Sequence, residues 1–263
     1  MIRRIDAVSY GNAFRSLSPM WKSGFAAVMF VLSFVLDPAL QLAISLWLMI
    51  WCIFYAKIPI QLYGMLLGSA LLFYLISLPV LVVEIGRPAA GEAMVVMPLP
   101  GSSLSLYMTA AGLWRGGLLL ARVAACLSCF FFLILTTPFG ELLQVLSRLR
   151  MPQIVLELML IMYRFLFLLS DTAHGMMLAR RLRGGTRGFM PKLREAAGMA
   201  GVLFAKTVQR YHGLSQGILT RGFAGDIVLP PCETRPVPVR YAIEAYIGMT
   251  VLVLVQSWLA WRL

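Results

Sequence analysis

Cysteine is the residue type in this sequence that could most readily hold a metal or carry redox chemistry. The chain has four, Cys52, Cys126, Cys129 and Cys232. Cys126 and Cys129 have the two-residue spacing of many zinc and thiol–disulfide sites. Their surroundings (Ala-Ala-Cys-Leu-Ser-Cys-Phe-Phe) contain no second pair of thiols and no histidine. A structural zinc needs four ligands. The pattern therefore favours cysteines packed in a membrane helix over a zinc or redox site.

Nucleotide-binding and catalytic motifs are also missing. The four lysines are Lys22, Lys57, Lys192 and Lys206, and none follows a glycine, so no phosphate-binding loop of the Gly-x-x-x-x-Gly-Lys-Ser/Thr type exists. His174 and His212 are distant in sequence from each other and from acidic clusters, and are interpreted as surface or packing residues. No paired carboxylates, nucleophile elbow or His-Glu-x-x-His occurs. These absences argue against a membrane enzyme and against a metal or cofactor site.

Basic side chains form the one distinctive chemical pattern. Residues 140–223 contain 12 Lys and Arg against four Asp and Glu, which accounts for eight of the chain's net twelve positive charges. Two segments here, Thr172–Gly185 and Gly213–Phe223, read as helical stretches that end in Arg-Gly. Glycine stops a helix because it adopts the left-handed conformation at little cost, and an arginine there favours the negative end of the helix dipole.

One such end would be an ordinary helix terminus, but the pair predicts more. The planar guanidinium suits bidentate contact with carboxylates of a partner protein. The expected helix over Lys192–Thr220 is also rich in small residues, which predict close approach of two helices and hence a rigid, two-pronged docking surface. These residues are Ala196, Ala197, Gly198, Ala200, Gly201 and Ala205.

The elements that must position these ends lie in a membrane. Of the 263 residues, 60% are hydrophobic and 13% charged, against about 25% charged residues in soluble domains. Stretches that are long enough to cross a bilayer as helices carry at most one charge. They are Ser23–Ala56, Gln61–Val83, Val123–Phe139 and Ala245–Trp261. No ten-residue alternation indicates a barrel. We expect an all-α polytopic membrane protein with five transmembrane helices, or six if Pro152–Ser170 also crosses, and with cytoplasmic coupling helices.

Charge and proline give the order of these helices. Residues 1–22 form a basic cytoplasmic start that includes Lys22. Asp37-Pro38 should divide Ser23–Ala56 into a hairpin, because proline cannot continue the helix. The segment Glu84–Ser105 is expected outside. Pro152–Ser170 is flanked by basic residues on both sides, so we expect a helix that begins at Met151-Pro152 and lies partly in the membrane.

This order divides the chain into four parts: 1–22 cytoplasmic, 23–139 transmembrane, 140–223 the coupling-helix region, and 224–263 a linker with the last span. Two arginines interrupt the span over Leu106–Phe139. Arg115 should lie near its external end, and Arg122 should face other helices rather than line a transport path.

The basic block has competing explanations. No helix-turn-helix, zinc or RNA-binding fingerprint is present, so nucleic acid is excluded as a partner. Contact with anionic lipid headgroups remains an alternative purpose for the charge. A self-sufficient secondary transporter is the alternative function, although no internal repeat is visible and mid-span charges are few.

Several runs carry a resemblance to a known family. They are Thr136-Thr137-Pro138-Phe139-x-Glu141-Leu142-Leu143, Leu149-Arg150-x-Pro152, Tyr163-Arg164-Phe165, Asp171, Ala179-x-Arg181-x-Arg183-Gly184 and Arg221-Gly222-Phe223. Together they resemble the transmembrane T component of energy-coupling factor (ECF) transporters, most closely the CbiQ type that serves cobalt and nickel uptake. The resemblance is loose before residue 130 and close over 136–223.

The resemblance implies a non-catalytic scaffold without a cofactor of its own, between two ATP-binding cassette subunits and a substrate-binding membrane subunit, the S component. By position, Arg183 and Arg221 would dock in grooves of the ATPases. The full set of docking positions is Ala179, Arg181, Arg183, Gly184, Arg221, Gly222 and Phe223. The second motif departs from the family's Ala-Met at Gly217-Ile218, which alters packing near that end and leaves Arg221 in place.

Overall fold

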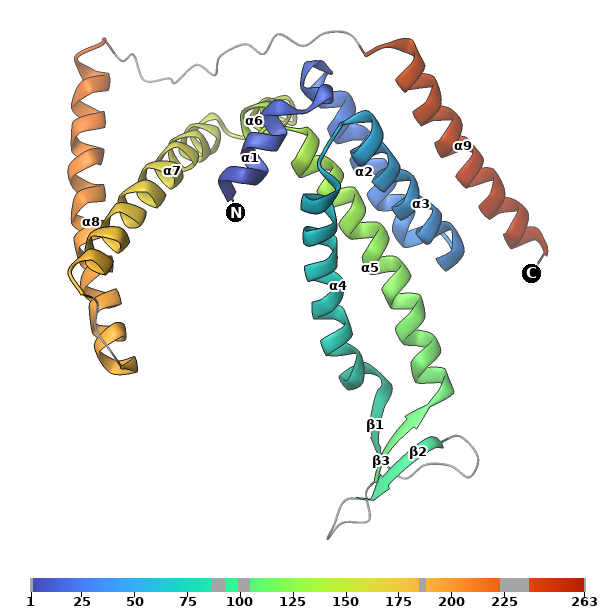
Figure 1. Ribbon diagram of the computed structural model, residues 1–263. Helices are drawn as coiled ribbons and strands as arrows, with labels where there is room; N and C mark the ends of the chain where they lie inside the picture. Colours follow the sequence, from blue (N-terminus) through green and yellow to red (C-terminus); the bar gives the residue numbers. More distant parts are fainter. Residues whose placement is uncertain (1, 87–92, 99–104, 185–187, 223–236, 263) are drawn as a thin grey trace. The chain divides into compact units, whose positions relative to one another are not determined.

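A computed structural model of the chain describes residues 2–86, 93–98, 105–184, 188–222 and 237–262 (Figure 1). Helices dominate it, and their bounds follow in chain order. They are α1 (Ile2–Gly11), α2 (Pro19–Val35), α3 (Pro38–Ile50), α4 (Ile60–Val82), α5 (Ala110–Thr136), α6 (Phe139–Arg148), α7 (Gln153–Leu182), α8 (Phe189–Leu219) and α9 (Val239–Arg262). A 3₁₀ turn, η1 (Ala13–Ser16), precedes α2, and a π turn, η2 (Trp51–Tyr55), extends α3. The expected all-α membrane architecture is confirmed.

A small sheet lies between α4 and α5. Strands β1 (Val83–Gly86), β2 (Ala93–Pro98) and β3 (Ser105–Thr109) pair antiparallel in the order β1-β3-β2, with Val83 opposite Met108. The sequence interpretation placed this segment outside the membrane without assigning strands to it. The connection between α4 and α5 thus contains three strands, and α5 begins at Ala110.

The helix break at Asp37-Pro38 occurs as predicted. Pro38 occupies the first turn of α3, where its missing N–H is not needed. The end of α2 is satisfied by a side chain from the next helix, because the Nε2 of Gln41 donates to the carbonyls of Ser33 and Leu36, both at 2.9 Å. Gln41 is buried, so this cap fixes the α2–α3 corner inside the protein.

Within the part of the chain that the structure describes, five helical segments are long and apolar enough to cross a membrane: Pro38–Tyr55, Ile60–Val82, Ala110–Thr136, Gln153–Leu182 and Val239–Leu259. The number agrees with the expected five, but the membership differs. The 17-residue α2, which was expected to be a short span, is shorter than these five segments. Helix α7, which was expected to lie only partly in the membrane, is long and apolar enough to cross it. The chain is a multi-pass membrane protein.

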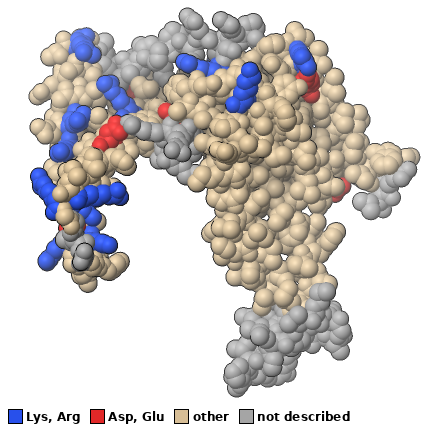
Figure 2. All heavy atoms as spheres, in the orientation of Figure 1, with Lys and Arg blue, Asp and Glu red and all other residues tan. Residues whose placement is uncertain are grey.

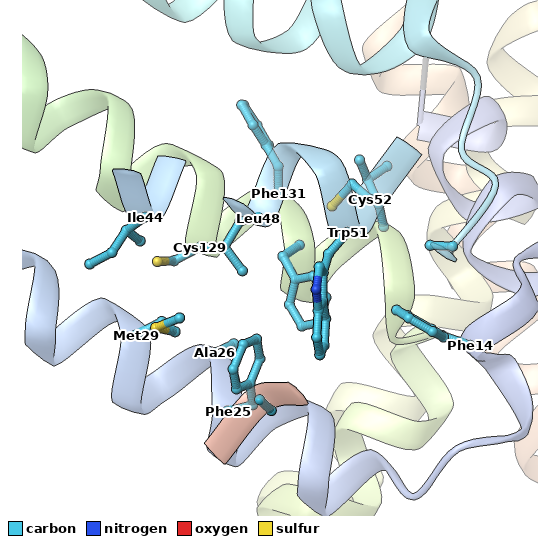
Figure 3. Packing of buried hydrophobic residues seen from close by; sticks show 14 of the residues in the cluster. Phe14, Phe25, Ala26, Met29, Ile44, Leu48, Trp51, Cys52, Cys129 and Phe131 are labelled. Carbon is cyan, nitrogen blue, oxygen red and sulfur yellow. The ribbon is translucent and has the colours of Figure 1, made fainter. Parts of the chain in front are cut away.

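Contacts divide the chain into two compact units. The first comprises residues 1–145 and 232–263, and the second comprises residues 146–231. The core of the first unit is aromatic and centres on Trp51, which is 2% exposed (Figure 3). Its ring stacks on Phe25 at 5.2 Å between centroids and meets Phe14 edge-on at 6.2 Å. These contacts join α2, α3 and η1.

Helix α9 packs closely on α3 where Gly248, which has no side chain, leaves room for the ring of Trp47. A Cβ on Gly248 would lie within 2.8 Å of three ring carbons of Trp47. At one end of this contact Gln256 Oε1 accepts from the backbone N–H of Asp37 at 3.1 Å, and at the other Tyr241 meets Tyr55 edge-on. The last span is therefore part of the first unit, although the chain reaches it only after the second.

The second unit consists of α7 and α8. Its one ion pair within the described residues joins the two helices, Arg180 Nε to Glu195 Oε2 at 3.2 Å, and Arg180 also approaches the sulfur of Met199. Very little of this unit is buried within itself: Leu156 is the one buried residue of α7, and α8 has none among its described residues. Most of the surface of both helices is therefore left uncovered by contacts within this unit.

Candidate docking site

Arg183 and Gly184 end α7. Arg183 is the C-cap, and its backbone N–H donates to the carbonyls of Ala179 (3.3 Å) and Arg180 (3.1 Å). Gly184 follows with φ +93°, the left-handed conformation in which other residues are strained. Ala179, Arg181 and Arg183 are all exposed. The sequence prediction of a glycine-stopped helix end with a free arginine is confirmed here.

Arg221 and Gly222 follow the end of α8 in the same manner. At the end of the helix, the backbone N–H of Thr220 donates to the carbonyl of Gln216. In the turn that follows, the N–H groups of Arg221 and Gly222 donate to the carbonyls of Ile218 and Leu219, respectively. Gly222 has φ +75°. Arg221 is exposed, one residue past the C-cap rather than within the last turn. Phe223 lies outside the described residues.

The two ends do not form one compact site. Glu195, in the second turn of α8, is paired with Arg180, so the α7 end lies beside the beginning of α8. Arg221 is 26 residues further along, which corresponds to about 40 Å of helix. Within the described part of the chain neither Arg183 nor Arg221 forms an ion pair. The structure thus offers two separate, unneutralised arginines, each beside the negative end of a helix dipole.

Charge gathers on this unit. Many of the Lys and Arg side chains visible in Figure 2 lie over α7 and α8. Large apolar side chains are exposed between them, among them Phe189 (82%) and Phe204 (72%) on α8. A surface that combines arginines with exposed aromatic groups is typical of protein–protein contact sites.

The small residues of α8 do not act as predicted. The six alanines and glycines between 196 and 205 are all exposed, and a Cβ added at Gly198 or Gly201 would meet nothing within 4 Å. The contact with α7 uses larger side chains on another face of α8, such as Glu195 and Met199. The expectation that small residues bring α8 close to α7 is wrong, because helix periodicity places them away from that face.

Two single charges of the first unit lie in opposite surroundings. Arg122 is exposed near the middle of α5, and the expectation that it faces other helices stays a prediction. Lys22, which the sequence placed in a basic cytoplasmic start, is fully buried. Arg115 is exposed in the second turn of α5, close to the end where it was expected.

Lys22 forms a buried ion pair that sequence reasoning did not find. Its Nζ donates to Glu141 Oε2 at 2.8 Å, to the carbonyl of Thr136 at 3.1 Å and to the carbonyl of Phe14 at 3.2 Å. All three N–H bonds of the ammonium group are used. Beside it, Asn12 Nδ2 donates to the carbonyl of Leu135 at 2.8 Å.

This network lies where the membrane helices meet α6. Thr136 and Leu135 are the last residues of α5, so their carbonyls form its negative end, and Glu141 is in the first turn of α6, at the positive end. Helix α6 is the last element before the α7–α8 unit. The network therefore fixes the position from which the chain leaves the first unit. Glu141 belongs to a run used for the resemblance, but 119 residues separate it from Lys22, and no local pattern links them.

The fold and these two helix ends define a class: a multi-pass, predominantly helical membrane protein that presents a basic helical pair. The chain belongs to the CbiQ family of cobalt transport proteins, whose family model matches residues 12–230. The resemblance noted in the sequence is thereby confirmed, and the chain is a membrane component of cobalt transport.

Three relatives show how far this similarity extends. An uncharacterized protein of Methanocaldococcus jannaschii is 26% identical over 226 residues, which cover 86% of this chain and 82% of the relative. The cobalt transport protein CbiQ of Salmonella typhimurium is 27% identical over 230 residues, covering 86% and 99%. A putative fused cobalt transport protein, CbiMQ, of Methanocorpusculum labreanum is 29% identical over 183 residues, covering 70% of this chain and 30% of that protein.

Proposed function

We propose that this chain is the non-catalytic T component of an ECF-type importer for cobalt or nickel ions. It would couple two cytoplasmic ATP-binding cassette subunits to a substrate-binding membrane subunit. Closure of the two ATPases on ATP would move the α7 and α8 ends, and the membrane helices would transmit this movement to the substrate subunit. The metal is the cargo of that partner, and no cluster of three or more His, Cys, Asp or Glu able to hold a metal occurs in the described ranges.

The observation that carries the proposal is the duplication of one helix end. Arg183-Gly184 and Arg221-Gly222 have the same residue types, the same left-handed glycine and the same exposure. An exposed guanidinium beside a helix C-terminus is free to make two parallel hydrogen bonds to a carboxylate. Two equivalent ends about 40 Å apart fit two copies of one kind of partner better than a single partner.

The exposure of Arg122 supports the proposal that a second partner binds inside the membrane. It lies 13 residues after Thr109, the N-cap of the 27-residue α5, and so about 20 Å along that helix. An arginine at the centre of a span costs about 2.5–3.5 kcal/mol when it faces lipid. Because Arg122 is exposed in this chain, a neighbouring membrane subunit that supplies a carboxylate or carbonyl oxygen would remove that cost. Fusion of a CbiQ-like region into the relative named CbiMQ agrees with such a neighbour.

The test is co-purification with charge reversal. In the native host, the tagged chain is expected to bring down two ATP-binding cassette subunits. Arg183→Glu combined with Arg221→Glu should abolish that association and metal uptake, while the variant still inserts into the membrane. Lys192→Glu with Arg194→Glu is the matched control, since both residues are exposed on α8 and the change in charge is equal.

Two results would contradict the proposal. One is uptake by the double Arg variant at the rate of the unmodified protein. The other is metal accumulation in vesicles that contain this chain alone and no ATP, which would instead establish a self-sufficient secondary transporter.

A further inference from the structure

A groove of about 400 Å³ lies between α7 and α8, well away from the two Arg-Gly ends. Five of its lining residues come from α7, namely Arg164, Phe165, Phe167, Leu168 and Asp171, and two from α8, namely Arg210 and Leu214. Its volume is within the range of sites that accept small organic ligands. Its lining combines aromatic and aliphatic side chains with two guanidinium groups, one from each helix.

The charges of the groove favour an anion. Arg164, Leu168 and Asp171 are spaced by four and three residues, so they follow one face of α7, and Arg210 reaches the same groove from α8. One carboxylate against two guanidinium groups leaves the groove net positive. Arginine binds phosphate oxygens through parallel hydrogen bonds that a lysine ammonium cannot form.

The surroundings of the groove indicate the level of a lipid headgroup. Before the groove, α7 exposes large apolar side chains, including Ile154 (76%) and Leu158 (58%). The helix is apolar enough to enter a bilayer. Beside the groove the exposed residues Ser170, Asp171 and His174 are polar, and large exposed apolar side chains return only beyond them, from Met177 onward. The site therefore lies where a long apolar surface of α7 is first interrupted by a polar band, as expected at the level of lipid headgroups.

We propose that this groove binds one anionic phospholipid. The phosphodiester would lie between Arg164 and Arg210, and an acyl chain would continue along the apolar lining at Phe165 and Leu168. This inference goes beyond the docking function. Arg164 precedes Arg183 by 19 residues and Arg210 precedes Arg221 by 11, which corresponds to about 28 Å and 16 Å of helix. A bound lipid would hold α7 and α8 together where little protein is buried between them.

The experiment measures lipid binding by native mass spectrometry on the chain alone in mild detergent. Phosphatidylglycerol is expected to stay bound in preference to phosphatidylcholine. Arg164→Gln with Arg210→Gln should weaken phosphatidylglycerol binding about a hundred- to ten-thousandfold, because the two lost charged contacts contribute about 1.5–3 kcal/mol each and 1.4 kcal/mol is tenfold. Lys192→Gln with Arg194→Gln removes the same charge from α8 outside the groove and should leave binding unchanged.

Three outcomes would overturn the proposal. They are equal binding of the two lipids, equal weakening by the control pair, and displacement of the lipid by millimolar inorganic phosphate, which would mean a site for the free ion. Asp171→Asn provides a test of the opposite sign, because removing the carboxylate should tighten phosphatidylglycerol binding. Because the assay contains no ATPase, failure of the docking proposal would not affect it.

Discussion

The buried pair between Lys22 and Glu141 allows a quantitative prediction. Lys22 is 0% exposed, and its ammonium group makes hydrogen bonds to one carboxylate and two backbone carbonyls. Lys22→Met removes the cation and leaves the Glu141 carboxylate buried without its partner. Removing one member of a buried ion pair costs about 3–5 kcal/mol, because the stranded charge is no longer compensated. We therefore expect the free energy of unfolding to fall by about that amount.

The matched comparison is the double variant Lys22→Met with Glu141→Met. It removes both charges and fills a similar volume with apolar groups, a change that is often neutral or stabilising in other proteins. Here it still leaves the carbonyls of Phe14 and Thr136 without a donor, at about 1–3 kcal/mol for each buried group. We expect the double variant to recover part of the stability that the single variant loses.

The assay is reversible unfolding in mixed micelles with increasing sodium dodecyl sulfate, followed by helical circular dichroism. Tryptophan fluorescence provides a second probe, because Trp51 lies in the core that includes Phe14. A single variant within about 1 kcal/mol of the unmodified protein, or a double variant no more stable than the single one, would refute the reasoning, since either result means that Glu141 does not depend on Lys22.

Three further predictions follow from close contacts and backbone geometry. Gly248→Ala places a Cβ within 2.8 Å of the Trp47 ring and should destabilise the packing of α9 by about 1–3 kcal/mol in the same unfolding assay, whereas Gly201→Ala, which meets nothing within 4 Å, should not. Gly184→Val forces a branched side chain to φ +93°, at a cost of about 1–2 kcal/mol, and should weaken ATPase co-purification without reducing the amount of protein in the membrane; normal co-purification would contradict it. Asn12→Ala removes the donor to the carbonyl of Leu135 and should lower the free energy of unfolding by about 1 kcal/mol. An unchanged midpoint of unfolding in sodium dodecyl sulfate would contradict this prediction.

The features that the sequence predicted correctly depend on local chemistry. Pro38 cannot continue the preceding helix because of its own ring, and the glycines at 184 and 222 end helices because of their own backbone freedom. The length of an apolar stretch likewise predicts a span directly. These signals need no knowledge of the rest of the chain, so they gave the helix order and the two candidate docking ends.

The features that the sequence did not predict depend on which distant residues meet. The burial of Lys22 could not be predicted because its partner Glu141 is 119 residues away in the sequence. Which surface Arg122 faces is a question of packing that hydropathy does not address, although the sequence places it within a span. Small residues in α8 predicted a close crossing, but their periodicity alone cannot identify the face that meets α7.

The length of α8 has a consequence for assembly. If Arg183 and Arg221, which flank α8, bind two ATPases, the number of residues in this helix sets the distance between the two ATPase subunits. Deleting seven residues from its exposed middle would shorten α8 by about 10 Å and rotate its C-terminal end about the helix axis by only about 20°. Deleting two would shorten it by about 3 Å and turn that end by about 160°, so that Arg221 would point away from its partner. The length of α8, and the rotation that this length imposes on Arg221, would thus decide whether two ATPase subunits can bind the same membrane protein.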